Sequence, residues 1–307
     1  MNKNDRWYKW MIIALCAMIF LCAFAAIRFS SEETKQVITV VLSDSSNERW
    51  DRLRLGIKQA ATDNNIEIHI LSTEKFTSSE EEIKTIESSI QDSDGFIVQW
   101  QNSNQVSSIL SKMIEKGPVI QINDSTEQKE LGSVIIPDSS QIGKSLASEV
   151  VLHNKETIKG KRIGVVTGSL SIQMNLTCKN AFENAIEKEG AKVIWETESM
   201  DSIDETNIDI LVVCDALELE SLPTLKNVEV YGVGGSLTDV YKLDTGIITS
   251  LLVVNDYYTG YEAISMLAKK LNNRLFTLQD KSTAYFVINK DNLYSSENQK
   301  VLFIDRS

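Results

Sequence analysis

The sequence predicts an α/β fold made of two lobes, each with a mostly parallel sheet, behind an apolar N-terminal segment. Three observations support this prediction. The chain has 307 residues, which is enough for two domains. Short apolar runs alternate with stretches whose apolar residues recur at the helical period of about 3.6 residues. This alternation begins near residue 36 and starts again near residue 161, and it is typical of parallel sheets covered by helices.

The N-terminal segment has the features of a transmembrane helix. Residues 11–27 form an uninterrupted apolar run of 17 residues, and about 17–25 are needed to cross a bilayer. Lys3, Arg6 and Lys9 precede the run, so the positive-inside rule predicts a cytoplasmic N-terminus. We therefore expect a single-pass protein of the cell membrane with an extracytoplasmic body. Residues 1–35 would comprise a cytoplasmic stub, a signal-anchor at about 11–27 and a spacer.

A cleaved secretory signal is the alternative interpretation of this segment. The motif A-F-A at 23–25 follows an apolar core of ordinary signal length and fits the small-x-small rule for cleavage. Cleavage would release the body as a secreted protein. Leucines precede both Cys16 and Cys22, which argues against a lipoprotein processing site. Of the two interpretations, the uncleaved anchor is favoured.

Two series of short apolar runs along the body predict the strands of the two lobes. Helical spacing separates the first four runs, and Leu53, Ile57 and Ala60 share one face of such a helix. Two series of this kind imply two parallel sheets with right-handed crossovers. The predicted strands are V-I-T-V-V-L (37–42), I-E-I-H-I-L (66–71), D-G-F-I-V-Q-W (94–100), P-V-I-Q-I-N (118–123), S-V-I-I-P (133–137), K-R-I-G-V-V-T-G-S (161–169), A-K-V-I-W-E (191–196), I-D-I-L-V-V-C-D (208–215) and V-E-V-Y-G-V (228–233).

The loops that follow these strands are the expected binding region, because ligands of such sheets bind beyond the carboxyl ends of the strands. These loops are rich in Ser, Asn, Gln and Asp, and the first and third of them carry Trp50 and Trp100. Amide side chains bond hydroxyl groups, and the apolar face of a sugar ring can rest on an indole. The loops therefore favour a small polyhydroxylated ligand.

Composition and motifs argue against several other functions. With 43 acidic and 31 basic residues, the formal charge of −12 disfavours nucleic acid as a partner. His69 and His153 lie far apart, without neighbours at ligand spacing, so no metal site or cofactor is expected. No nucleophile motif occurs, and I-G-K-S at 142–145 lacks the first glycine of a phosphate loop, so no enzyme is expected. Cys178 and Cys214 are expected to be separate, buried core residues.

Seven segments in order along the body carry a family resemblance. They are the opening strand with its N-E-R-W loop, D-G-F-I-V-Q, G-P-V-I-Q-I-N-D, I-P-D-S-S-Q-I-G-K-S-L-A, K-R-I-G-V-V-T-G-S, V-N-D-Y-Y-T-G-Y-E-A-I and Y-F-V-I-N-K-D-N. Over about residues 36–293 the chain resembles the type I periplasmic binding proteins of the ribose and galactose class. The resemblance implies two lobes joined by three hinge strands, with a ligand held in the cleft between them. Lobe I would be 36–138 plus 255–284, lobe II 139–254 plus 285–294, and 295–307 a C-terminal tail.

The resemblance carries over to individual residues unevenly. Asn47, Trp50 and Asp215 match ligand-binding positions of typical sugar binders. Leu176 stands in place of an arginine and Gly234 in place of a frequent acidic residue. Cys214 replaces an asparagine, and an Asn-Asp pair replaces the usual Asp-Arg. The predicted ligand-binding residues are Asn47, Trp50, Trp100, Asn123, Asp124, Asp138, Asp215 and Asn255.

The second lobe also lacks one helix of the family pattern. The segment S-M-D-S-I-D-E-T-N (199–207) offers about one helical turn, so a partner or a neighbouring helix is expected to cover the exposed sheet face. The leading hypothesis is a membrane-anchored solute-binding protein that delivers a sugar-like ligand to an ABC transporter. The alternative is a ligand-sensing module that signals to a membrane histidine kinase or another partner.

Overall fold

The computed structural model describes residues 7, 11, 13–20, 35–42, 49–72, 79–99, 103–122, 132–170, 172–204 and 207–303. The chain divides into two compact units, Met1–Gln36 and Val37–Ser307, and each is considered by itself. In the first unit, residues 11 and 13–20 are helical. Within the described part of the chain, no helix combines the length and the apolar character that spanning a membrane requires. Residues 12 and 21–27 of the predicted anchor lie outside the described residues.

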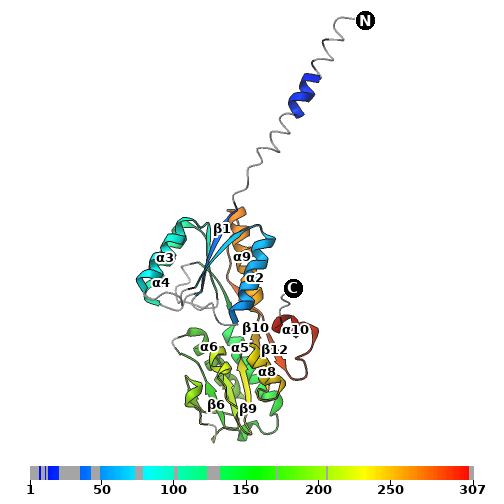
Figure 1. The fold of residues 1–307 in the computed structure, drawn as a ribbon. Helices are drawn as coiled ribbons and strands as arrows, with labels where there is room; N and C mark the ends of the chain where they lie inside the picture. Colours follow the sequence, from blue (N-terminus) through cyan, green and yellow to red (C-terminus); the bar gives the residue numbers. More distant parts are fainter. Residues whose placement is uncertain are drawn as a thin grey trace. The chain divides into compact units, whose positions relative to one another are not determined.

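Lobe I is built on a six-stranded parallel sheet with helices on both faces (Figure 1). Its central strands are buried on both sides, which explains why they appear in the sequence as continuous apolar runs. In order across the sheet the strands are β11 (Lys281–Thr283), β5 (Ser133–Pro137), β4 (Val119–Ile122), β3 (Gly95–Gln99), β1 (Val37–Leu42) and β2 (Glu67–Ser72).

Two pairs of helices sandwich this sheet. Helices α2 (Arg49–Asp63) and α9 (Asp256–Asn272) pack on one face, where Leu53 and Ile264 belong to the same apolar cluster as Ile97 of β3. Helices α3 (Ser79–Gln91) and α4 (Ser103–Lys116) cover the other face. Because α9 and β11 come after β10 of the second lobe in sequence, lobe I is assembled from two separate parts of the chain.

Lobe II repeats this plan with a second six-stranded sheet. Helices α5 (Ser139–His153) and α6 (Gln173–Lys188) cover one face, and the short helix η2 (Ile158–Gly160) follows α5. All neighbouring strands are parallel except β12, which runs antiparallel to β10. The strands in order are β12 (Tyr285–Asn289), β10 (Ser250–Val254), β9 (Glu229–Val233), β8 (Ile210–Val213), β6 (Ile163–Val166) and β7 (Val193–Thr197).

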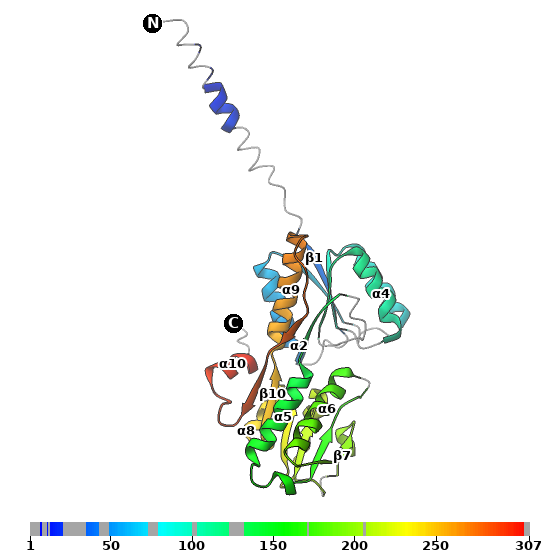
Figure 2. The ribbon, with the colours of Figure 1, turned by 180° about the vertical axis from the view of Figure 1, so that it is seen from behind.

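The opposite face of the lobe II sheet is covered by short elements of the chain itself. The shortened segment forms only a single turn, η3 (Met200–Ser202). Met200 packs in one apolar cluster with residues of the other short helices and with Val301 and Leu302 near the C-terminus. Figure 2 shows α8 and α10 at lobe II. These short helices are α7 (Ala216–Glu220), α8 (Leu237–Asp244) and α10 (Ser296–Leu302). The sheet face that the sequence left thinly covered is therefore buried by several short helices.

The chain passes between the two sheets at three neighbouring places. Asp138 follows β5 and caps α5, since its Oδ1 accepts a hydrogen bond from the Gln141 backbone N at 2.9 Å. Asn255 follows β10 and caps α9 in the same way, accepting from the Tyr258 N at 3.1 Å. The third passage is at Ala284, whose carbonyl accepts a bond from the Asn255 N at 3.0 Å. A helix therefore begins at two of the three crossings.

One exposed ion pair of lobe II gives a prediction for pH dependence. The Arg162 guanidinium, 2.8 Å from the Asp209 carboxylate, holds the pKa of Asp209 at about 2. Since this pKa is depressed, the pair stabilises the fold above the ordinary carboxyl pKa of 3.8, and the contribution is lost as pH falls through about 2. We expect Arg162→Gln to return the pKa of Asp209 toward 3.8, as measured by NMR titration of its carboxyl carbon. An unchanged pKa would contradict this. The effect on stability is expected to be small, because both side chains are partly exposed to solvent.

Candidate ligand-binding site

A cavity of about 170 Å³ lies between the two lobes, at the carboxyl ends of the strands. Lobe I contributes residues of α2 and the end of β3, and lobe II contributes α5, α6 and the loops after β8 and β9. This is the edge at which parallel sheets bind ligands. The lining residues are Trp50, Arg52, Gln99, Pro137, Ser139, Ile142, Ile172, Met174, Asn175, Cys178, Cys214, Asp215, Ala216, Leu217, Glu220, Val233, Gly234, Gly235, Ser236, Asp239, Val254 and Asp256.

Arg52 connects α2 of lobe I to lobe II across this cavity. Its Nη1 donates a hydrogen bond of 2.6 Å to the carbonyl of Gly235, in the loop between β9 and α8. Its Nη2 lies 3.9 Å from Oδ2 of Asp256, the first residue of α9. The Arg52 Nε is buried and has no hydrogen-bond partner among the described residues. One donor of this guanidinium therefore makes no bond to that part of the chain.

Asp239 provides an acceptor from lobe II. Its Oδ2 accepts hydrogen bonds from the backbone N atoms of Gly235 at 2.9 Å and Ser236 at 3.0 Å, which completes a capping box at the start of α8. Its Oδ1 is buried and has no hydrogen-bond partner in the part of the chain that the structure describes. A Cβ placed on Gly234 would lie 2.6 Å from the Asp239 Oδ2. The carboxylate of Asp239 thus lies beside position 234, where the family resemblance leads one to expect an acidic side chain.

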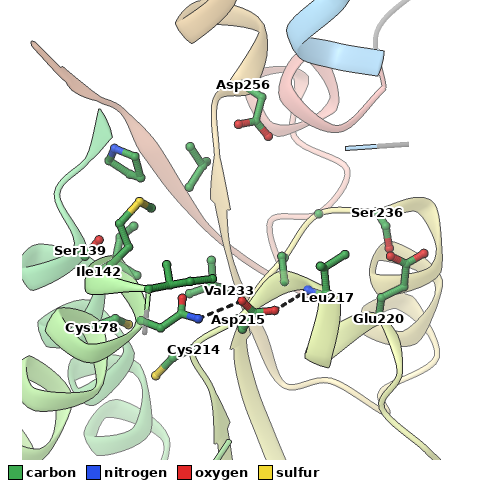
Figure 3. A pocket seen from close by; sticks show the side chains of 18 of the residues that line it. Ser139, Ile142, Cys178, Cys214, Asp215, Leu217, Glu220, Val233, Ser236 and Asp256 are labelled. Carbon is green, nitrogen blue, oxygen red and sulfur yellow. Dashed lines mark hydrogen bonds between the residues drawn. The ribbon is translucent and has the colours of Figure 1, made fainter. Parts of the chain in front are cut away.

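Asp215 lines the cavity but is already engaged within the protein (Figure 3). Its Oδ1 accepts from the N atoms of Leu217 at 2.9 Å and Glu218 at 3.1 Å, capping α7, and its Oδ2 accepts from the Asn175 amide at 3.1 Å. Gly168 makes room for this arrangement, because its φ is +68° and a Cβ there would lie 2.5 Å from the Cβ of Asp215. Asp215 therefore fixes the wall of the cavity, and its carboxylate has less capacity left for a ligand.

One wall of the cavity is apolar and sulfur-rich. Ile142 of α5, Met174 and Cys178 of α6, and Cys214 at the end of β8 all line it. Figure 3 shows Cys178 and Cys214 beside Asp215. The hydrogen bond with the Cys178 thiol, together with burial, raises the pKa of the Cys214 thiol well above its ordinary value. Both cysteines are buried core residues, as predicted, but they lie next to each other rather than separately.

The charges around the cavity are mostly negative. The lining residues include the cation of Arg52 and four carboxylates, those of Asp215, Glu220, Asp239 and Asp256. Arg52 already lies near Asp256 and donates to Gly235. A negatively charged ligand would meet net repulsion in this partly buried space. The site is therefore suited to a neutral or positively charged molecule.

The predicted site residues fall into three groups. Trp50, with 6% of its surface exposed, and Asp215 line the cavity. Asp138 lines an adjacent pocket, and Asn255 stands between two lining residues, Val254 and Asp256, while capping α9. The structure thus brings the described residues of the set to one region. The remaining residues, Asn47, Trp100, Asn123 and Asp124, lie outside the described residues.

Four residues that line the cavity were not among the predicted site residues: Arg52, Asn175, Asp239 and Asp256. Arg52 lies two positions after Trp50, and Asp256 follows Asn255 directly, so both adjoin residues that the resemblance had marked. Asn175 precedes Leu176, the position at which the resemblance leads one to expect an arginine. Asp239 had no such signal, because it reaches the site only through the turn at Gly234 and Gly235.

The fold and the cavity define a two-lobed binding protein, and a family comparison agrees with this class. Residues 38–275 match the periplasmic binding protein domain family. The chain therefore belongs to this family, and its resemblance to the type I class is confirmed. No curated protein matches the chain.

Solved structures with this fold cover most of the chain. A glucose-galactose binding protein, GanP, from Geobacillus stearothermophilus has 17% identity and a TM-score of 0.73, over 85% of this chain and 100% of its own. A carbohydrate transporter solute binding protein from Agrobacterium radiobacter, in complex with D-arabinose, has 14% identity and a TM-score of 0.76, over 88% and 100%. The XylFII–LytSN complex contains a chain with 18% identity and a TM-score of 0.68, over 84% and 98%. At identities of 14% to 18%, these similarities are evidence of a shared fold alone.

Proposed function

We propose that the chain binds a small, neutral, polyhydroxylated molecule, a sugar or a close analogue, in the cavity between its lobes. One observation carries this proposal. Among the described residues, two buried side-chain atoms lack a hydrogen-bond partner, the Arg52 Nε and the Asp239 Oδ1, and both residues line this cavity. A buried polar atom without a partner is costly. Hydroxyl groups both accept and donate, so one ligand can satisfy the donor on lobe I and the acceptor on lobe II.

The other properties of the cavity support the same class of ligand. The excess of carboxylates disfavours sugar acids and sugar phosphates. Trp50 and the apolar wall beside Ile142 offer surfaces for the C–H face of a sugar ring. Two relatives of the fold, GanP and the Agrobacterium radiobacter protein, are a glucose-galactose binding protein and a protein in complex with D-arabinose.

Recognition of this kind needs no chemical step. A ligand that contacts both lobes stabilises the arrangement in which the lobes face each other, because its binding energy depends on both sets of contacts. The three chain crossings, at Asp138, Asn255 and Ala284, are where the backbone would absorb a change in the angle between the lobes. The proposed activity is therefore reversible capture without turnover.

Isothermal titration calorimetry tests the ligand class. We expect at least one neutral monosaccharide or polyol to bind with a dissociation constant below about 1 mM, corresponding to about −4 kcal/mol. Matched sugar acids and sugar phosphates should give no measurable heat at the same concentrations. The proposal fails if no neutral sugar binds in this range, or if a charged analogue binds more tightly than its neutral parent.

We also propose that residues 11–27 anchor the protein in the cell membrane, with the body outside the cytoplasm. The support comes from the 17-residue apolar run and the basic residues that precede it. N-terminal sequencing of the protein from a membrane fraction tests this. An uncut N-terminus is expected, whereas a mature chain beginning near Ala26 would show that the segment is a cleaved signal.

The role that we favour is delivery of the ligand to an ABC transporter, because the Agrobacterium radiobacter protein of similar fold is a carbohydrate transporter solute binding protein. Signalling to a membrane histidine kinase or another partner is the second candidate. It is favoured by the XylFII–LytSN complex, in which a chain of this fold is found together with a second protein. The neighbouring genes discriminate between the two roles. Permease and ATPase genes would support uptake, and genes for a kinase and a response regulator would support sensing.

A further inference from the structure

Cys178 and Cys214 form a pair of thiols in one wall of the cavity. Both are buried, with 3% and 5% of their surface exposed, and both belong to the same apolar cluster of lobe II. Both also line the cavity, so a small molecule that enters the cavity can reach them. They are free cysteines in this structure. Two neighbouring thiols that line a cavity can be oxidised to a disulfide, whereas two isolated buried cysteines cannot.

The backbone on each side of this pair is held in place. One turn before Cys178 on α6, the Asn175 amide donates to the Asp215 Oδ2 at 3.1 Å, and Asp215 follows Cys214 directly. Residues three apart on a helix share a face, so this bond presents Cys178 toward Cys214. The Cys214 N donates to the Val166 carbonyl at 2.8 Å, which fixes the end of β8 to β6.

Helix α5 holds α6 from the other side. A Cβ on Gly143 of α5 would lie 2.2 Å from the carbonyl oxygen of Cys178, so the two helices are in direct backbone contact at this level. A disulfide needs Cα atoms about 4.4–6.8 Å apart and β-carbons that point toward each other. The hydrogen bond between the two thiols and the neighbouring Asn175–Asp215 bond place the two side chains next to each other, as a disulfide requires.

We propose that Cys178 and Cys214 are a site of reversible disulfide formation, reached through the cavity by a small disulfide. In the first step, one cysteine attacks the disulfide R–S–S–R, which gives a mixed disulfide and one R–SH. In the second step, the other cysteine attacks the mixed disulfide, which closes the Cys178–Cys214 bond and releases a second R–SH. The protein loses two hydrogens, and the oxidant disulfide is reduced to two thiols.

This cross-link would join α6 to the end of β8, next to the Asn175–Asp215 hydrogen bond. It would restrict the unfolded chain and hold that wall of the cavity in a single arrangement. The raised pKa of the Cys214 thiol lowers the fraction of thiolate that can attack a disulfide, so we expect oxidation of the folded protein to need an excess of oxidant. The inference concerns the thiols alone and does not depend on which ligand the cavity binds.

The test uses the full-length chain with C16S/C22S, which leaves Cys178 and Cys214 as its cysteines. The reduced protein in detergent is treated with excess 4,4′-dithiodipyridine, and its intact mass and its free thiols after denaturation are measured. We expect a mass lower by two hydrogens, no free thiol and a monomer on a non-reducing gel. The melting temperature should rise by about 5–10 °C and return to its starting value on reduction.

Single variants C178S and C214S in the same background are the controls. Each should keep a pyridylthio adduct on its remaining cysteine and show no disulfide-dependent rise in melting temperature. Two pyridylthio adducts on the parent protein, two unreacted thiols or a disulfide-linked dimer would each overturn the proposal. The melting temperatures of the reduced variants show whether they are folded, and a C178A/C214A variant gives the stability of the fold without either thiol.

Discussion

Replacing Arg52 with methionine is expected to weaken binding of the neutral ligand by about 10- to 150-fold, which corresponds to the loss of one charge-assisted hydrogen bond of about 1.5–3 kcal/mol. Methionine keeps roughly the length of the side chain but removes the Nε donor, which has no partner within the described ranges. It also removes the 2.6 Å hydrogen bond to the Gly235 carbonyl, which joins α2 to the loop of lobe II. The measurement is calorimetry with whichever neutral sugar binds the unmodified protein.

Arg54→Met is a matched control for this prediction. Arg54 lies on the same helix and is bonded to Asp51, and it does not line the cavity. The same chemical change there should leave the affinity within about twofold. Equal losses in the two variants would mean that Arg52 acts only through the stability of α2. An unchanged affinity in Arg52→Met would mean that the Arg52 Nε does not bind the ligand, and the main support for the proposed ligand class would be lost.

The strands were predictable from the sequence because their burial leaves a direct trace. β1 and β3 are buried on both faces, so each is a continuous apolar run, and the observed bounds of β1 and β5 agree with the predicted ones. For β6 and β8 the predicted runs extended into the flanking loops. The strand ends were not predictable from the sequence because the hydrogen bonds between neighbouring strands decide where each strand stops.

The cavity was less predictable because its polar groups come from elements that are distant in sequence. The Asp239 carboxylate lies beside Gly234, where the family resemblance leads one to expect an acidic residue, and this close approach depends on the turn at Gly234 and Gly235. The contact between Cys178 and Cys214 depends on the packing of α6 against the end of β8. Local patterns can indicate which loops face a ligand, but tertiary packing determines which side chains reach it.

Gly56→Ala is expected to destabilise the protein by about 1–3 kcal/mol and lower its melting temperature by about 2–10 °C. Helices α2 and α9 meet at this residue, where a Cβ would lie 2.0 Å from the Tyr257 carbonyl oxygen. Gly260 of α9 makes the reciprocal approach, 2.4 Å from the Leu53 carbonyl oxygen. The obstructing atoms belong to the backbone, so the helices must move apart, and this cost outweighs the gain of about 1 kcal/mol in helix propensity.

Gly160→Ala is the control, because no atom lies within 4 Å of a Cβ at that position. Its melting temperature should stay close to that of the unmodified protein. Separation of α2 and α9 would also displace Arg52 from Asp256, since the two residues lie on these two helices. We therefore expect Gly56→Ala to lose ligand affinity as well as stability, measured by calorimetry well below its melting temperature. A Gly56→Ala variant as stable as Gly160→Ala would show that the two helices do not pack in backbone contact.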